Sequence, residues 1–326
     1  MKSKHRKKLL SAVLLVLIVL GSLANPVNNH FSKKAEEIMP LVNFEDPISD
    51  AVRWSQRNFE PFFDLIASVI RNINEFYYHT MNFFPLYEFK LSSEIGVGVS
   101  MLAIALALLV GLLSGYKYAA ATFVVFEIFL CLGYWKAALV TFSLVLTAAF
   151  ISIAIGFPLG VIMARSDRCE TLISPALDFM QSFPPYIYLV PAVVFFGLGA
   201  APGVVATVLF AVPPPARLTN LGIREIPYEL KEAGRSFGCN SFQLLYKVEF
   251  PEAFPSILVG INQCIMMSLG MVVIAALIGA GGLGAEVIVG IQRLWIGKGI
   301  VAGLLVVMLA IWLDRVTCSL KKEKIT

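Results

Sequence analysis

The feature that most constrains this chain is a series of apolar runs, each long enough to cross a membrane as a helix. Crossing about 30 Å of hydrocarbon takes roughly 20 helical residues. Only helices satisfy the backbone in lipid at these lengths, because alternating strand-like patterns are absent. The sequence therefore predicts an all-α membrane protein, a polytopic helical bundle. We expect eight crossings, near residues 9–24, 95–115, 119–134, 137–163, 174–199, 203–217, 255–280 and 300–317.

The composition agrees with a lipid environment and argues against several other classes of protein. Hydrophobic residues make up 58% of the chain and charged residues only 15%, against about 25% charged in soluble domains. The net charge of +4 is too small and too dispersed for a nucleic-acid surface. The five cysteines form no CxxC pair and the three histidines are isolated, so we expect no metal site. GxSxG and HExxH are also absent, and no catalytic residue is predicted.

Basic residues set the expected orientation. Arg165 and Arg168 mark one loop as cytoplasmic, and the basic residues of the long loop 217–254 mark it the same way. Two crossings must separate these loops, so the apolar stretch between them is divided at the turn from Gly199 to Gly203. Both chain ends then face the cytoplasm.

The N-terminal part carries two open questions. The apolar run 9–24 follows a basic start and is either a retained membrane anchor or a cleaved signal-like segment. In both cases residues 25–94 lie outside. Within them an amphipathic helix is predicted, either on the outer membrane surface or docked against the bundle. Its apolar residues are Phe59, Phe62, Phe63, Ile66, Val69, Ile70, Ile73, Phe76, Tyr77 and Phe84, and its polar residues are Asp64, Ser68, Arg71, Asn72 and Glu75.

The long cytoplasmic loop 217–254 carries helix signals of its own. Pro227 suits a first helical position and Gly238 suits a left-handed stop, which predicts a helix of about three turns. A second helix is expected to be capped by Asn240 and Gln243 and to end at Pro251.

One face of the first loop helix has small residues at its centre. Leu230, Ala233, Gly234 and Phe237 fall on this face. It could admit a partner close to the backbone, or it could pack on the chain's own bundle. The residues themselves leave both alternatives open.

The same loop resembles the EAA loop of binding-protein-dependent importer permeases. The likeness lies in Glu232-Ala233-Gly234, Gly238, Val248 and Phe250-Pro251. Gly234 replaces the usual second Ala, and Val248 and Phe250 replace the usual Ile and Leu. The resemblance implies that the loop forms a coupling helix that fits a cleft on a cytoplasmic ATPase subunit. It assigns that contact to Glu232, Ala233, Gly234, Gly238 and Pro251.

Further motifs resemble the glycine betaine, proline and choline permeases over residues 137–317. They are Gly156-Phe157-Pro158-Leu159-Gly160, Tyr188-Leu189-Val190-Pro191, Arg235-Ser236-Phe237-Gly238, Gly260-Ile261-Asn262-Gln263, Met271-Val272-Val273-Ile274-Ala275, Gly281-Gly282-Leu283-Gly284 and Asp314-Arg315. The resemblance implies a type I ABC importer permease core in a bacterial cytoplasmic membrane. It also implies ATPase subunits, an extracytoplasmic substrate-binding protein and a second copy of the permease as partners. The solute would be a quaternary ammonium compound or related compatible solute, or alternatively another small amino-acid-like solute.

These observations give a domain organisation. Residues 1–24 form the anchor or signal-like segment and 25–94 the extracytoplasmic segment. Residues 95–136 hold two accessory helices, and 137–317 form the permease core with the loop 217–254. A cytoplasmic tail covers 318–326.

No nucleotide site is expected in this chain. The stretch Gly279–Gly284 matches GxGxxG but ends an apolar helix, and it suggests a closely packed turn. Gly297-Lys298 lacks the remaining residues of a phosphate loop. We therefore expect no enzyme activity and no cofactor here, with ATP and Mg²⁺ used by the partner ATPase.

Three polar residues in apolar runs invite a functional interpretation. Glu127 could line a water-filled path or be a neutral carboxyl bonded to a neighbouring helix. Asn262 and Gln263 could line the translocation path or bond between helices. An ion-coupled secondary transporter is the main alternative class, but we find no internal repeat and such a fold would leave the EAA-like loop unexplained.

Overall fold

The computed structural model describes residues 45–83, 86–90 and 96–322. The predicted run 9–24, the rest of residues 1–44 and residues 323–326 of the predicted tail lie outside this part. The chain divides into two compact units between Glu60 and Pro61, and the account below concerns the second unit. Its α-helices are α3 (Glu45–Asn82, shared with the first unit), α4 (Met101–Ser114), α5 (Tyr116–Cys131), α6 (Trp135–Arg165), α7 (Asp167–Ser182), α8 (Leu189–Phe196), α9 (Ala200–Ala211), α10 (Pro213–Arg224), α11 (Tyr228–Ser236), α12 (Ser241–Leu244), α13 (Phe250–Ala275), α14 (Gly282–Gln292) and α15 (Ile296–Lys322).

The predicted all-α class is confirmed, with one small exception. Strands β1 (Leu86–Lys90) and β2 (Gly96–Ser100) pair antiparallel, with Tyr87 opposite Val99. The membrane helix predicted from residue 95 begins at Met101, about two turns later. Gly-Val-Gly-Val at 96–99 explains the strand, because glycine disfavours a helix by about 1 kcal/mol and valine suits a pleated strand.

Four helical stretches in the described residues are long and apolar enough to cross a membrane: Trp135–Arg165, Ala200–Arg224, Ser241–Ile278 and Ile296–Ser319. The predicted crossings 95–115 and 119–134 correspond to α4 and α5, which have only 14 and 16 residues. Helix α15 continues through 318–322, so the described part of the predicted tail is helical.

The predicted crossing 174–199 is not one straight helix. Helix α7 and the segment Pro185–Phe196 meet at an angle of 104°. The cause is Pro184-Pro185, because prolines cannot donate a backbone hydrogen bond and they force the preceding residue into an extended conformation. Phe183 accordingly has φ −77° and ψ 141°. The predicted division into two helices is confirmed, but the break lies at 197–199 and not across Gly199–Gly203. Helix α8 ends at Phe196, α9 begins at Ala200, and both Gly197 and Gly199 have positive φ.

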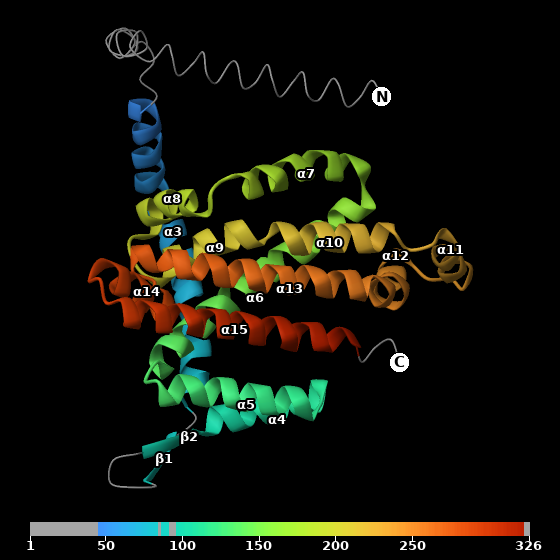
Figure 1. The fold of residues 1–326 in the computed structure, drawn as a ribbon. Coiled ribbons are helices and arrows are strands. Elements are labelled where there is room, and N and C mark those ends of the chain that lie inside the picture. Colours follow the sequence, from blue (N-terminus) through green and yellow to red (C-terminus); the bar gives the residue numbers. More distant parts are fainter. Residues whose placement is uncertain (1–44, 84–85, 91–95, 323–326) are drawn as a thin grey trace, which may run out of the picture. The chain divides into compact units, whose positions relative to one another are not determined.

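The main helices pack side by side through glycines. In Figure 1, α9, α10, α13 and α15 run across the view, with α11 and α12 at one end and α14 at the other. A Cβ on Gly156 would lie 2.8 Å from Pro215 Cγ, and one on Gly160 would lie 2.5 Å from the Ala216 carbonyl oxygen. This pair of glycines, four residues apart on α6, therefore allows close packing against α10.

The part of α3 in the second unit docks against the bundle, which decides between the two predicted positions. Phe63 stacks on Phe195 of α8 with ring centroids 4.6 Å apart. Ala67 and Ile70 are buried, and the residues predicted for the polar face are exposed. The predicted apolar face is only partly covered, because Phe59, Phe62, Val69 and Phe76 are also exposed, and Phe84 lies outside the described residues. Helix α3 therefore contributes one stripe to the packed bundle.

The Gly279–Gly284 stretch forms a tight turn between α13 and α14, as predicted. Gly279, Gly281 and Gly282 have positive φ. The Leu283 amide donates to Thr141 Oγ1 at 2.8 Å, and a Cβ on Gly282 would lie 2.4 Å from the same oxygen. Glycine is therefore required for this contact with α6.

Candidate functional site

The connection between α10 and α13 projects from one end of the bundle and carries the EAA-like residues (Figure 1). It is shorter than the predicted loop 217–254, because α10 runs on to Arg224 and a helix resumes at Ser241. We call residues 225–249, which join α10 to α13, the coupling connection. At its centre α11 spans Tyr228–Ser236.

Both ends of α11 follow from local backbone preferences. Pro227 has φ −52° and ψ 137° and is the N-cap, so α11 begins one residue later than predicted. Gly238 has φ 81°, so the predicted left-handed stop is confirmed. A Cβ on Gly238 would meet no atom within 4 Å. A glycine is therefore needed at position 238 for the backbone conformation and not for a contact within the chain.

The second predicted helix of the loop is present but does not stop at Pro251. Asn240 and Gln243 form a reciprocal capping box, with the Gln243 amide donating to Asn240 Oδ1 at 2.8 Å. A π-helical turn, η2 (Leu245–Glu249), then leads directly into α13. Pro251 lies in the first turn of α13, where its missing N–H removes little hydrogen bonding.

Helix α11 is fixed to its own chain through Gly234. This residue is buried, and a Cβ there would lie 2.8 Å from Leu244 Cδ1 and 3.2 Å from Val248 Cγ2. Lys231 Nζ also donates to the Ile223 carbonyl oxygen at 2.8 Å. The small residue at position 234 thus serves packing within the chain, which is the second of the two predicted alternatives.

The coupling connection exposes several large aromatic side chains. Four aromatic side chains are largely exposed there, and we call them the exposed aromatic set: Tyr228 (64%), Phe237 (90%), Phe242 (75%) and Tyr246 (68%). Glu232 and Ala233 are exposed beside them on α11. Exposed clusters of large apolar side chains mark interaction sites, and aromatic residues are enriched in interface cores. The face predicted from helical spacing is therefore divided, with Gly234 inward and Ala233 and Phe237 outward.

Two ion-pair groups attach the coupling connection to the corner between α6 and α7. At its end, Arg165 binds Glu249 through Nη1 to Oε1 at 3.1 Å and Nη2 to Oε2 at 2.6 Å. At its start, Arg224 binds Asp167 Oδ1 at 2.7 Å and Glu170 Oε2 at 3.0 Å. From the sequence, Arg165 was expected only to mark a cytoplasmic loop, and Glu249 was not predicted. The available signal in the sequence was a glutamate between the apolar residues Val248 and Phe250.

With this geometry in place, comparison with known proteins identifies the family. Residues 156–320 match the family model of the binding-protein-dependent transport system inner membrane component. The chain is 40% identical over 288 residues to the glycine betaine/carnitine transport permease protein GbuB of Listeria monocytogenes serotype 1/2a (strain 10403S), covering 87% of this chain and 96% of GbuB. The chain belongs to this family.

A second relative supports the same assignment. The glycine betaine/proline betaine transport system permease protein ProW of Escherichia coli (strain K12) is 39% identical over 304 residues, covering 93% of this chain and 82% of ProW. A solved chain of the MetNI methionine ABC transporter in inward facing conformations is 25% identical and covers 56% of this chain and 93% of its own, with a TM-score of 0.49. The protein is thus an inner membrane permease component of a bacterial transport system.

The two amides predicted for the path have different surroundings in the permease. Asn262 Nδ2 donates to Asp314 Oδ1 on α15 at 2.9 Å, which is a bond between helices. Asn262 Oδ1 is buried without a hydrogen-bond partner in the part of the chain described here. Gln263 is exposed. The structure does not bring the two side chains to one surface, as the turn of about 100° between adjacent helical residues requires.

Asn262→Leu is expected to destabilise the permease, because Asp314 would lose its amide donor. The expected loss is about 1.5 kcal/mol, the lower end of the range for a hydrogen bond to a charged group, because Asp314 is only half-buried. Gln263→Leu, next to it and exposed, is the matched control and should change stability by less than about 0.5 kcal/mol. The unfolding midpoint of each purified variant in detergent measures the difference. Equal midpoints for the two variants would contradict a structural role of Asn262.

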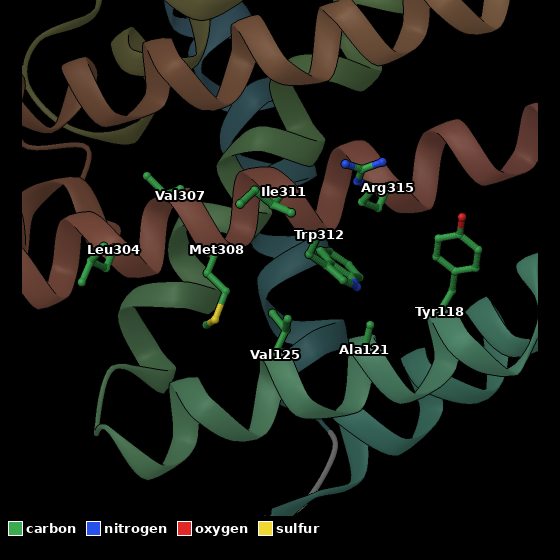
Figure 2. Close-up of a pocket in the computed structure, with 9 residues that line it drawn as sticks. All are labelled: Tyr118, Ala121, Val125, Leu304, Val307, Met308, Ile311, Trp312 and Arg315. Atoms are coloured by element: carbon green, nitrogen blue, oxygen red, sulfur yellow. The ribbon is translucent and has the colours of Figure 1, made fainter.

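An apolar cavity between α5 and α15 does not involve the predicted path. It has a volume of about 290 Å³ and is open between α5 and α15 (Figure 2). Its lining residues are Tyr118, Ala121, Val125, Leu304, Val307, Met308, Ile311, Trp312 and Arg315. Trp312 Nε1 donates to Thr122 Oγ1 at 2.8 Å beside it. Glu127 lies half-buried on α5 and is not among the lining residues.

Proposed function

We propose that this permease is the membrane-spanning subunit of an ATP-driven importer and that it carries a quaternary ammonium solute of the glycine betaine class. The observation that supports the solute class is the 40% identity to a relative named for glycine betaine and carnitine transport. The relative named for glycine betaine and proline betaine transport adds to it. All three solutes combine a quaternary ammonium group with a carboxylate, so a small zwitterion is the expected cargo.

The coupling connection is the surface on which a separate ATPase subunit would dock. The exposed aromatic set supplies apolar contact area, and Glu232, Ala233 and Gly238 lie beside it without being needed for packing inside the chain. Gly234 and Pro251 support this surface from within, through α12 and the first turn of α13. Energy would come from ATP and Mg²⁺ bound by the ATPase, because the sequence contains no GxxxxGK[ST] motif.

The complete importer would contain two copies of this permease, two ATPase subunits and an extracytoplasmic binding protein. Most selection is expected in that binding protein, where an aromatic cage can attract the ammonium through the ring faces. The permease then needs only a wet, weakly polar passage, since tight binding midway would slow release. Asn262 and Gln263 remain candidates for that passage, and Glu127 remains a candidate for either a passage or a structural role.

The test is uptake of labelled glycine betaine by proteoliposomes that hold the permease, its ATPase and its binding protein. We expect uptake only when all three proteins and ATP are present. The purified permease alone should neither bind nor hydrolyse ATP. Nucleotide binding at one molecule per permease, or uptake driven by an ion gradient without ATP, would contradict the proposal. ATP-driven uptake of an amino acid in place of glycine betaine would overturn only the solute class.

A further inference from the structure

A buried ion pair lies directly behind the coupling connection. Glu249 is only 1% exposed, and both of its carboxylate oxygens bind the guanidinium of Arg165. The Arg165 side chain is 36% exposed, so the positive partner reaches solvent while the negative one does not. Two parallel hydrogen bonds of this kind fix orientation as well as distance.

The two charged residues lie at the ends of helical segments, where a movement of one segment would reach the next. Arg165 is the last residue of α6, and Glu249 is the last residue of the π-helical turn between α12 and α13. A π turn holds one residue more than an α turn and is often found at functional sites. In this turn Val248, the residue before Glu249, lies 3.2 Å from where a Cβ on Gly234 of α11 would be.

The residues around the ion pair are apolar, so the buried Glu249 carboxylate depends on Arg165 for charge compensation. The adjacent residues Ala164 and Phe250 belong to a cluster that also contains Ile223, Ile226 and Ile257. Phe157 of α6 packs edge-on against Phe250, with ring centroids 5.8 Å apart. Loss of Arg165 would leave the Glu249 carboxylate buried without compensation, whereas replacement of both residues by apolar ones can preserve packing.

The other attachment of the coupling connection reaches the same corner but is more exposed. Arg224 donates to Met163 O at 2.9 Å and to Asp167, whose side chain is 90% exposed. Exposed ion pairs contribute little because water screens them. The connection is therefore held at its start by a half-buried arginine with one exposed and one half-buried carboxylate partner, and at its end by a bidentate pair with a buried carboxylate. Both contacts involve residues 163–170.

We propose that the Arg165–Glu249 ion pair transmits movement of the coupling connection to the α6–α7 corner, so that ATP hydrolysis by the docked ATPase moves the membrane helices. Arg165 and Glu249 are positioning residues in this inference, and it rests on the proposed function. Attraction between the charges keeps the two boundaries together when the ATPase pulls or pushes on α11. An apolar contact at the same place would fill the space but would let the end of α6 shift relative to the start of α13.

The experiment measures solute taken up per ATP hydrolysed in the reconstituted importer. The variants are E249Q, the apolar pair R165M/E249L and the exchanged pair R165E/E249R. E286Q is the matched control, because Glu286 pairs with Lys298 at 2.7 Å between α14 and α15, at the other end of the bundle. We expect E249Q and R165M/E249L to lower the ratio at least tenfold with ATP hydrolysis retained. The exchanged pair should recover at least part of it, and E286Q should change it less than twofold.

Several results would overturn the inference. A wild-type ratio in R165M/E249L would show that the pair serves packing alone. Failure of both E249Q and R165M/E249L to yield monodisperse protein would make the pair a folding element. No uptake of any solute by the wild-type importer would instead contradict the proposed function, and the inference with it. These outcomes are distinguishable because the first is read from the transport ratio of R165M/E249L, the second from the yield of the two variants, and the third from the wild-type importer.

Discussion

Gly160→Val is expected to abolish the folded permease. A Cβ at this position would lie 2.5 Å from the Ala216 carbonyl oxygen and 2.6 Å from Thr219 Cβ. Both atoms belong to α10, and neither is the end of a flexible side chain, so α6 and α10 would have to separate. Overpacking of this kind costs about 1 to 3 kcal/mol when neighbours can adjust, and more is expected here because backbone must move. The measurement is the yield of monodisperse protein after extraction into detergent.

Gly270→Val is the matched control for this prediction. Gly270 lies within the membrane helix α13, and a Cβ there would meet no atom within 4 Å. The same side chain in the same secondary structure should therefore leave the yield close to that of the wild type. A normal yield for Gly160→Val would show that the tight α6–α10 contact is not needed for the fold.

Gly238→Val is expected to abolish uptake while the permease still inserts and folds. The residue has φ 81°, a left-handed conformation that costs an L-residue about 1 to 2 kcal/mol, and a β-branched side chain adds to this cost. No atom of the chain would clash with the new side chain. The effect should therefore be confined to the turn between α11 and α12, and it would displace Phe237 from its place in the exposed aromatic set.

Gly238→Asn tests whether the backbone conformation is the cause. Asparagine adopts the left-handed region more readily than other residues with a side chain. We expect Asn to retain a substantial part of the wild-type uptake in proteoliposomes and Val to retain none. Equal loss in both variants would indicate that the ATPase needs the space at this position. Normal uptake by Gly238→Val would contradict the docking role of the coupling connection.

Local signals explain why much of the fold could be predicted. The lengths of the apolar runs determined the helical class, because a backbone in lipid must satisfy its hydrogen bonds within the segment. Single residues with narrow backbone preferences also acted locally. Gly199 separates α8 from α9, Gly238 stops α11, and Asn240 with Gln243 caps α12. The errors at Pro251 and at Pro184-Pro185 concern how helices continue or bend, which a hydropathy pattern does not contain.

The sequence by itself thus determined the membrane class, the positions of the main helix breaks and the EAA-like loop. Only the tertiary structure decided which side of α11 faces outward, with Gly234 inward against Leu244 and Phe237 exposed. It alone paired Arg165 with Glu249, which are 84 residues apart. The physical reason is that helix and turn preferences act within a few residues. Burial and charge pairing depend on which distant surfaces meet, and helical periodicity cannot specify that.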